Sequence, residues 1–206
     1  MNTVLAIGAH PDDIELGCAG TLALHAAKGE KVYLLILTRG EASGDPDVRE
    51  MECRESAKIL GATYVFLGGL RDTVIQDGRE TIDVIENALH QAKPDIVYAP
   101  SYKDTHQDHR KTGYAAMSAC RRVRIILLYE GASTQRDFTP QVFVDIAESF
   151  ETKLKATQVF GSQMHNHNGG YRKAVKAIEG LAKYRGYQAG VEVAEAFEVG
   201  KFIFEV

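Results

Sequence analysis

The sequence is poor in cysteine, and the positions of its cysteines exclude two kinds of site. Cys18, Cys53 and Cys120 are odd in number, far apart, and never in CxxC spacing. This pattern speaks against a disulfide framework and against a zinc site built from cysteines. We therefore expect buried free thiols in a reducing cytoplasm.

Long apolar runs and an excess of basic charge are also missing. No run approaches the roughly 18 apolar residues that a membrane span needs, and the first residues, MNTVLAIGAHPDD, lack the features of a signal peptide. The formal net charge is -4, and the densest basic stretch, RRVR at 121–124, is interpreted as a solvated helix end. We expect neither a nucleic acid nor a membrane as a partner, and we expect a cytoplasmic protein.

Short apolar runs alternate with amphipathic stretches along the chain. Apolar residues recur every three or four positions over 82–92 and 171–182, which predicts helices. This alternation predicts an α/β fold, a Rossmann-like three-layer sandwich with a mainly parallel sheet, as a single domain over 1–206. The runs with the length and composition of buried strands are 4–9, 32–37, 64–67, 95–99 and 125–129.

The last third of the chain is less regular. Residues 142–146 alternate apolar with polar side chains, and residues 202–206 are predicted to form a closing strand. Between them, 162–170 (SQMHNHNGG) is polar and glycine-rich, which predicts a loop. We interpret His165 and His167 in this segment as solvated side chains.

Histidines and carboxylates gather directly after two of the expected strands. HPDD begins at His10, and DTHQDH ends at His109. The two strands are expected to be neighbours at the crossover of the sheet, where ligands bind beyond the carboxyl ends of strands. Unpaired charges gather there only at a cost, so a divalent cation is the natural compensation. Two imidazoles and one carboxylate suit zinc and leave a position open for water.

This set of residues predicts metal-assisted hydrolysis of an amide. Asp12, beside Asp13, would accept a proton from the attacking water. His106, beside His109, would donate a proton to the leaving amine.

Other interpretations of the same residues stay open. Asp12 or Asp13 can cap a helix, and Thr105 with Asp108 matches a capping box. A non-haem iron enzyme uses a similar ligand set, and a non-catalytic sugar-binding or metal-binding module can keep the same fold. A dinucleotide site and a serine hydrolase are disfavoured, because the GxGxxG and GxSxG motifs are missing.

AHPDD followed by HQDH resembles the LmbE-like (PIG-L) superfamily of de-N-acetylases. It includes enzymes of glycosylphosphatidylinositol synthesis and sugar deacetylases of the mycothiol and bacillithiol pathways. The resemblance implies an LmbE-like fold and a zinc-dependent hydrolase that removes the N-acetyl group from an N-acetylglucosamine-type amino sugar or its glycoside. It also implies a homo-oligomer. Gln107 replaces the proline of the commoner HPDH motif, at a position that is not a ligand.

The resemblance also implies roles for individual residues in catalysis and metal binding. Asp12 would be the general base, and His106 would be the acid or the stabiliser of the oxyanion. Asp108 would orient His106. The implied zinc ligands are His10, Asp13 and His109.

Weaker matches place Arg49, Asp72 and Tyr171 at the substrate, with Tyr171 polarising its carbonyl group. Each has a purely structural alternative. Arg49 could simply begin a helix beside an acidic residue, Asp72 could shape a turn, and Tyr171 could face the core.

Overall fold

The computed structural model describes residues 1–164 and 170–204, without the side chains of 164 and 170–172. In this part of the chain, seven strands form one mixed sheet in the order β3-β2-β1-β4-β5-β7-β6. Strands β1 to β5 are parallel, and β7 is antiparallel to both β5 and β6. The strands are β1 (Thr3–Gly8), β2 (Lys31–Thr38), β3 (Tyr64–Leu70), β4 (Ile96–Pro100), β5 (Ile125–Tyr129), β6 (Val142–Asp145) and β7 (Ala194–Phe202).

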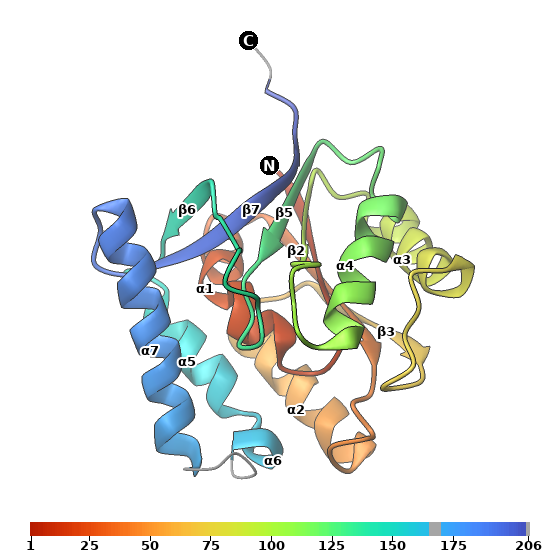
Figure 1. Ribbon diagram of the computed structural model, residues 1–206, viewed down its shortest axis with the longest axis horizontal. Coiled ribbons are helices and arrows are strands. Elements are labelled where there is room, and N and C mark those ends of the chain that lie inside the picture. Colours follow the sequence, from red (N-terminus) through yellow and green to blue (C-terminus); the bar gives the residue numbers. More distant parts are fainter. Residues whose placement is uncertain (165–169, 205–206) are drawn as a thin grey trace.

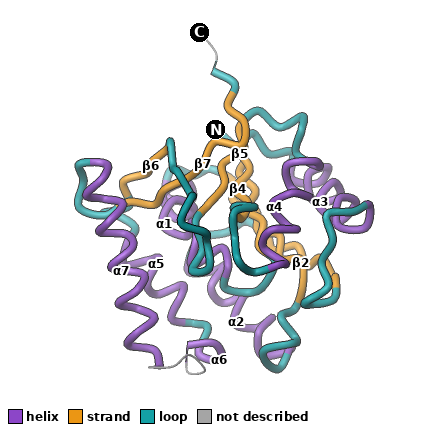
Figure 2. The backbone as a smooth tube through the Cα atoms, in the orientation of Figure 1, coloured by secondary structure: helices purple, strands orange, loops and turns teal. Residues whose placement is uncertain are grey.

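Helices cover both faces of the sheet, as Figures 1 and 2 show. One side carries α3 and α4, and the other carries α1, α2 and α5, with α7 beside α5. The predicted α/β three-layer arrangement is confirmed. The helices are α1 (Asp13–Ala27), α2 (Pro46–Ile59), α3 (Arg79–Ala92), α4 (Gln107–Ala119), α5 (Phe150–Gln158), α6 (Gly161–Met164) and α7 (Gly170–Ala189).

The central strands are buried on both faces because successive side chains point to opposite sides of a strand. Leu5 and Ile7 of β1 belong to the core beneath α3 and α4. Val4 and Ala6 belong to the core beneath α1 and α2. Burial on both faces explains why β1 reads as a continuous apolar run.

Strand β1 is the point at which the sheet changes direction. From β1 the chain adds β2 and β3 on one side, and β4 and β5 on the other. Leu5 of β1 pairs with Val97 of β4, so the predicted adjacency of these strands is confirmed. The segments after β1 and β4 therefore leave the sheet side by side, where open α/β sheets bind ligands.

The predictions for the last third of the chain are partly wrong. The closing strand begins at Ala194 and ends at Phe202, instead of spanning 202–206. Its acidic residues Glu195 and Glu198 are buried beside lysines, so the segment reads as polar although it lies inside the sheet. The expected loop 162–170 begins within α6, while His165 and His167 lie outside the described residues. No helix in the described part is both long and apolar enough to cross a membrane.

Candidate active site

The turn between β1 and α1 carries a strained aspartate. Asp12 has a φ of 106°, in the left-handed region that residues other than glycine rarely adopt. It occupies the N-cap position of α1, yet its carboxylate makes no capping hydrogen bond. Asp13 Oδ2 instead accepts the backbone N–H of His10 at 2.8 Å. The helix-capping interpretation therefore does not explain Asp12.

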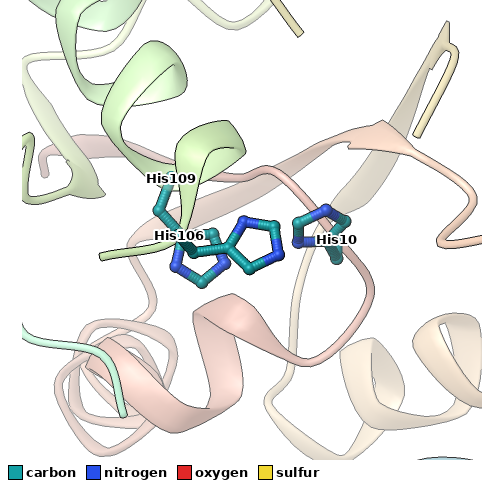
Figure 3. A group of neighbouring side chains, drawn as sticks. All are labelled: His10, His106 and His109. Carbon is teal, nitrogen blue, oxygen red and sulfur yellow. The ribbon is translucent and has the colours of Figure 1, made fainter. Parts of the chain in front are cut away.

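His10, Asp13 and His109 come together across the β1–β4 junction. Asp13 Oδ2 lies 3.4 Å from His10 Nδ1, and Asp13 Oδ1 lies 3.1 Å from His109 Nε2. One carboxylate thus links one ring nitrogen of each histidine. Figure 3 shows His10 facing His106 and His109, which come from the start of α4. The structure therefore assembles the three residues implied as zinc ligands.

The second nitrogen of each of these histidines faces other carboxylates. His10 Nε2 lies 3.0 Å from Asp72 Oδ1 and 3.2 Å from Asp108 Oδ2. His109 Nδ1 lies 3.2 Å from Asp104 Oδ2. Histidines that bind metals generally donate their other N–H in this way, which fixes the ring and its tautomer. The sequence analysis missed this role of Asp104, although it belongs to the same DTHQDH segment.

The Asp108 carboxylate makes neither of the two contacts that we expected from the sequence. It is fully buried, and its Oδ2 contacts His10 and accepts the N–H of Thr73 at 2.8 Å. Its Oδ1 has no hydrogen-bond partner among the described residues. Asp108 meets His106 only through its backbone N–H, which donates to His106 Nδ1 at 3.3 Å. The carboxylate therefore orients His10, and its expected contact with His106 was wrong.

The capping-box interpretation of Thr105 and Asp108 is also wrong. The N-cap of α4 is His106, which lies one residue further along. The Thr105 hydroxyl donates to the Ser133 carbonyl instead. Asp104 Oδ1 accepts the His106 N–H at 2.7 Å, which shapes this turn from outside the helix.

The electrostatics of the site favour positive charge at two of its imidazoles. Burial alone lowers the pKa of His10 and His109, but the surrounding carboxylates, with Asp13 foremost, raise these pKa values to about 12 and about 10. Burial and the two neighbouring imidazoles lower the pKa of His106, which favours its neutral form.

The donor atoms of the site fit a divalent cation. Ring nitrogens of His10, His106 and His109 lie within 4.8 Å of one another, and the Asp13 carboxylate lies against the first and the last of these rings. Imidazole nitrogen with carboxylate oxygen is a donor set that suits zinc. The unpartnered Asp108 Oδ1 adds negative charge that a cation would offset.

Arg49 holds the strained turn from the side of α2. Its Nη2 donates to the Pro11 carbonyl at 2.6 Å and to Asp12 Oδ1 at 3.4 Å, and its Nη1 donates to the Gly40 carbonyl at 2.9 Å. Burial and the charge of Asp13 raise the pKa of Asp12 to about 7, although Arg49 opposes this shift. A carboxylate with such a pKa is suited to exchange protons near neutrality. These contacts place Arg49 at the site through Asp12, whereas its proposed contact with substrate stays a prediction.

The structure describes the side chain of Asp72 but not that of Tyr171, the two other residues expected at the substrate. Asp72 shapes its turn by accepting the Thr73 N–H at 2.7 Å, and it also contacts His10, so its role extends beyond the turn. The backbone of Tyr171 belongs to the first turn of α7. Its side chain lies outside the described residues, and its proposed role stays a prediction.

Comparison with known proteins identifies a family to which this chain is similar. Residues 5–120 match the family model PIG-L, GlcNAc-PI de-N-acetylase. Over 161 residues the chain is 39% identical to the uncharacterized deacetylase YaiS of Escherichia coli K12, covering 74% of this chain and 87% of that protein. It is 29% identical over 185 residues to a diacetylchitobiose deacetylase of Thermococcus kodakarensis, covering 78% of this chain and 69% of that enzyme.

One similar protein has a different activity in its name. A 4-oxalmesaconate hydratase of Pseudomonas putida is 25% identical over 203 residues, covering 80% of this chain and 77% of the hydratase. Among solved structures, the conserved protein TT1542 of Thermus thermophilus matches with a TM-score of 0.89 and 31% identity, covering 100% of this chain and 98% of that one. An N,N′-diacetylchitobiose deacetylase of Pyrococcus horikoshii matches with a TM-score of 0.85 and 27% identity, covering 95% of this chain and 82% of that one.

Proposed function

The chain belongs to the PIG-L (GlcNAc-PI de-N-acetylase) family, and we propose that it is a zinc-dependent hydrolase that removes the N-acetyl group from an N-acetylglucosamine-type amino sugar or its glycoside. The observation that carries the proposal is the Asp13 carboxylate, which links His10 to His109. The other nitrogen of each histidine faces a carboxylate, as in metal-binding histidines. His10, Asp13 and His109 would hold the zinc ion.

The residues of this chain can divide the work of amide hydrolysis between them. Bound zinc would supply Lewis acidity, which polarises a carbonyl group and acidifies water. Asp12 accepts a proton from the water that adds to the amide carbon, and its raised pKa suits this role. The carbon–nitrogen bond then breaks as Asp12 passes this proton to the amine nitrogen, and acetate and the free amine are released. Arg49 positions Asp12 through its contacts with the same turn.

His106 is better suited to stabilise the oxyanion than to serve as an acid. Its Nδ1 accepts the N–H of Asp108, so in the neutral ring the proton lies on Nε2. This N–H can donate a hydrogen bond to the amide oxygen as negative charge develops on it.

The related hydratase suggests water addition to a carboxylate-bearing substrate as a second function. The two functions differ in their products, because hydration adds water across a double bond and releases no acetate. Acetate release therefore distinguishes the hydrolase from a hydratase. A non-catalytic sugar-binding or metal-binding module and a non-haem iron enzyme are the remaining alternatives.

The first test combines metal content with acetate release. We expect about one zinc per chain after chelation and re-exposure to zinc, measured by elemental analysis. His109→Ala should lose the metal, while His90→Ala, at an exposed position on α3, should retain it. Acetate should be released from a panel of methyl N-acetylglucosaminide and diacetylchitobiose.

The alternatives make different predictions for the same test. Zinc binding without acetate release would leave the hydratase and the non-catalytic module. A preference for iron, together with oxygen uptake, would indicate the oxygenase.

The family resemblance and the cysteines bear on the oligomeric state and the cellular compartment. We propose a homo-oligomer from the family resemblance, and light scattering tests it. We also propose a reducing cytoplasmic location. The three cysteines are free and buried, which is consistent with a reducing compartment.

A further inference from the structure

A cavity of about 490 Å³ lies between α7 and the body of the molecule. Its walls come from α1, α5, α7 and β7, and most of their surface is apolar. The volume is within the range of about 300–1,000 Å³ that is typical of small-molecule sites. Large apolar side chains in the lining are Leu16, Phe160, Ile178 and Leu181.

Four of the charged side chains in the wall form two ion pairs with one another. Lys153 Nζ lies 2.6 Å from Glu195 Oε1, and both side chains are nearly inaccessible to solvent. Arg185 makes a two-pronged contact with Glu130, at 2.8 Å from Nε and 2.6 Å from Nη2. These pairs neutralise their own charges, so the cavity offers an apolar surface to a ligand.

The cavity adjoins the candidate active site. Asp12, the proposed base, is part of its lining. A smaller pocket of about 50 Å³, lined by Asp13 and His109, shares Leu16, Gly131 and Ala132 with the large cavity. A ligand whose amide lies at Asp12 can therefore extend another of its groups into the cavity.

We propose that this cavity binds an alkyl chain of the substrate, so that the enzyme prefers amino sugars with such a chain to those with only small substituents. This inference rests on the proposed function, because it places the chain on the substrate of the deacylation. Sugar hydroxyls would find few partners on an apolar wall. A methylene that leaves water there tightens binding by up to about fourfold. The alkyl chain can belong to the N-acyl group or to the aglycone, and in both cases the cavity would contact methylene groups.

Two pairs of substrates test the proposal and distinguish these sources. We would measure kcat/KM for N-octanoyl against N-acetyl glucosamine, and for octyl against methyl N-acetylglucosaminide. In at least one pair, we expect kcat/KM to be higher for the longer alkyl chain by at least about tenfold. This gain is smaller than about fourfold for every added methylene would give, because binding also restricts the motion of the alkyl chain. If neither pair favours the longer chain, the proposal is overturned.

Variants on α7 connect this preference to the cavity. Ala174→Phe and Ala177→Phe place a ring on residues that line the cavity, and the long-to-short ratio should fall towards one. Ala189→Phe makes the same change at an exposed α7 position outside the lining, so the ratio should stay at its wild-type value. Circular dichroism checks that each variant is folded. A wild-type ratio in both folded cavity variants would contradict the assignment.

A binding measurement separates this proposal from the proposed function. Octyl and methyl N-acetylglucosaminide would be titrated calorimetrically into chelator-treated protein, in which hydrolysis does not interfere. Tighter binding of the octyl glycoside, lost in Ala177→Phe, supports the cavity even if no acetate is ever released. Acetate release from the methyl glycoside with no gain from either chain would support the hydrolase and overturn the cavity assignment.

Discussion

Each histidine proposed as a ligand lies between carboxylates. Asp13 contacts one nitrogen of His10 and one of His109, while Asp108 and Asp104 contact the opposite nitrogens. An imidazole held on both sides cannot rotate freely, and its N–H is directed away from the metal position. At the scale of single residues, the aspartates therefore decide which nitrogen is available to a cation.

The role of Asp104 can be tested by Asp104→Asn. An amide is a poorer acceptor for the His109 N–H than a carboxylate, so we expect zinc affinity to fall by about 10–100-fold. Competition with a fluorescent chelator measures the dissociation constant. Asp137→Asn, at an exposed aspartate, is the matched control. An unchanged zinc affinity would exclude Asp104 as a positioning residue.

The role of Asp12 is tested by Asp12→Asn. The variant should keep its zinc, because the implied ligands are untouched, and should lose about 10²–10⁴-fold in kcat, as expected on removing a general base. Acetate release and zinc content are measured on the same samples, with Asp137→Asn again as the control. Full activity of the variant would remove Asp12 from the mechanism.

At the scale of elements, α1 is irregular, and two distant side chains compensate for this. Cys18 has non-helical angles, φ −144° and ψ 16°, which interrupt the hydrogen bonding of α1. Glu195 of β7 accepts the freed N–H groups of Gly20 and Thr21 at 2.9 and 2.7 Å. Lys153 of α5 donates to the Leu16 carbonyl at 2.8 Å and pairs with Glu195. The kinked helix that begins at Asp13 is thus anchored to β7 and α5.

Glu195→Ala should therefore destabilise the fold strongly. It leaves the Lys153 charge buried without its counter-ion and two backbone N–H groups buried without an acceptor, and we expect a loss of about 3–5 kcal/mol. Urea unfolding followed by circular dichroism measures the change. Glu55→Ala removes one partner of the exposed pair with Lys58 and should cost at most about 1 kcal/mol. Similar losses in the two variants would show that the buried network does not anchor α1.

A double variant separates two contributions of this network to stability, namely the ion pair and the hydrogen bonds to the backbone. A Lys153→Met/Glu195→Leu double variant removes both charges but still leaves the Gly20 and Thr21 N–H groups without an acceptor. We expect it to recover only part of the stability lost in Glu195→Ala. Full recovery in urea unfolding would mean that the charge pair alone matters.

At the scale of the whole molecule, the cysteines belong to the two cores that enclose the sheet. Cys120 lies in the core beneath α3 and α4, and Cys18 and Cys53 lie in the core beneath α1 and α2. Burial raises the pKa of all three thiols, that of Cys120 to about 12. The thiolate, which is the reactive form, is therefore suppressed even in mildly alkaline solution.

The thiols should consequently resist alkylation while the protein is folded. We expect iodoacetamide to leave Cys18, Cys53 and Cys120 unmodified in the native protein and to label all three in concentrated guanidinium, as mass spectrometry would show. Rapid labelling of the native protein would contradict the burial of these side chains.

The sequence by itself determined the architecture and the location of the site. Buried strands and amphipathic helices differ in their periodicity, and their alternation allows few arrangements other than a sheet covered on both faces. The HPDD and DTHQDH segments follow β1 and β4 directly, so once these strands are neighbours their histidines must converge. The misplacement of β7 has a physical cause, since Glu195 and Glu198 are polar in sequence but paired and buried in the fold.

Only the tertiary structure decided which carboxylate faces which imidazole. Sequence spacing placed Asp108 near His106, yet the start of α4 directs its carboxylate to His10. The anchoring of α1 by Lys153 and Glu195 and the cavity beneath α7 depend on residues far apart in the chain. Such contacts leave no local pattern, because they are set by how whole elements pack.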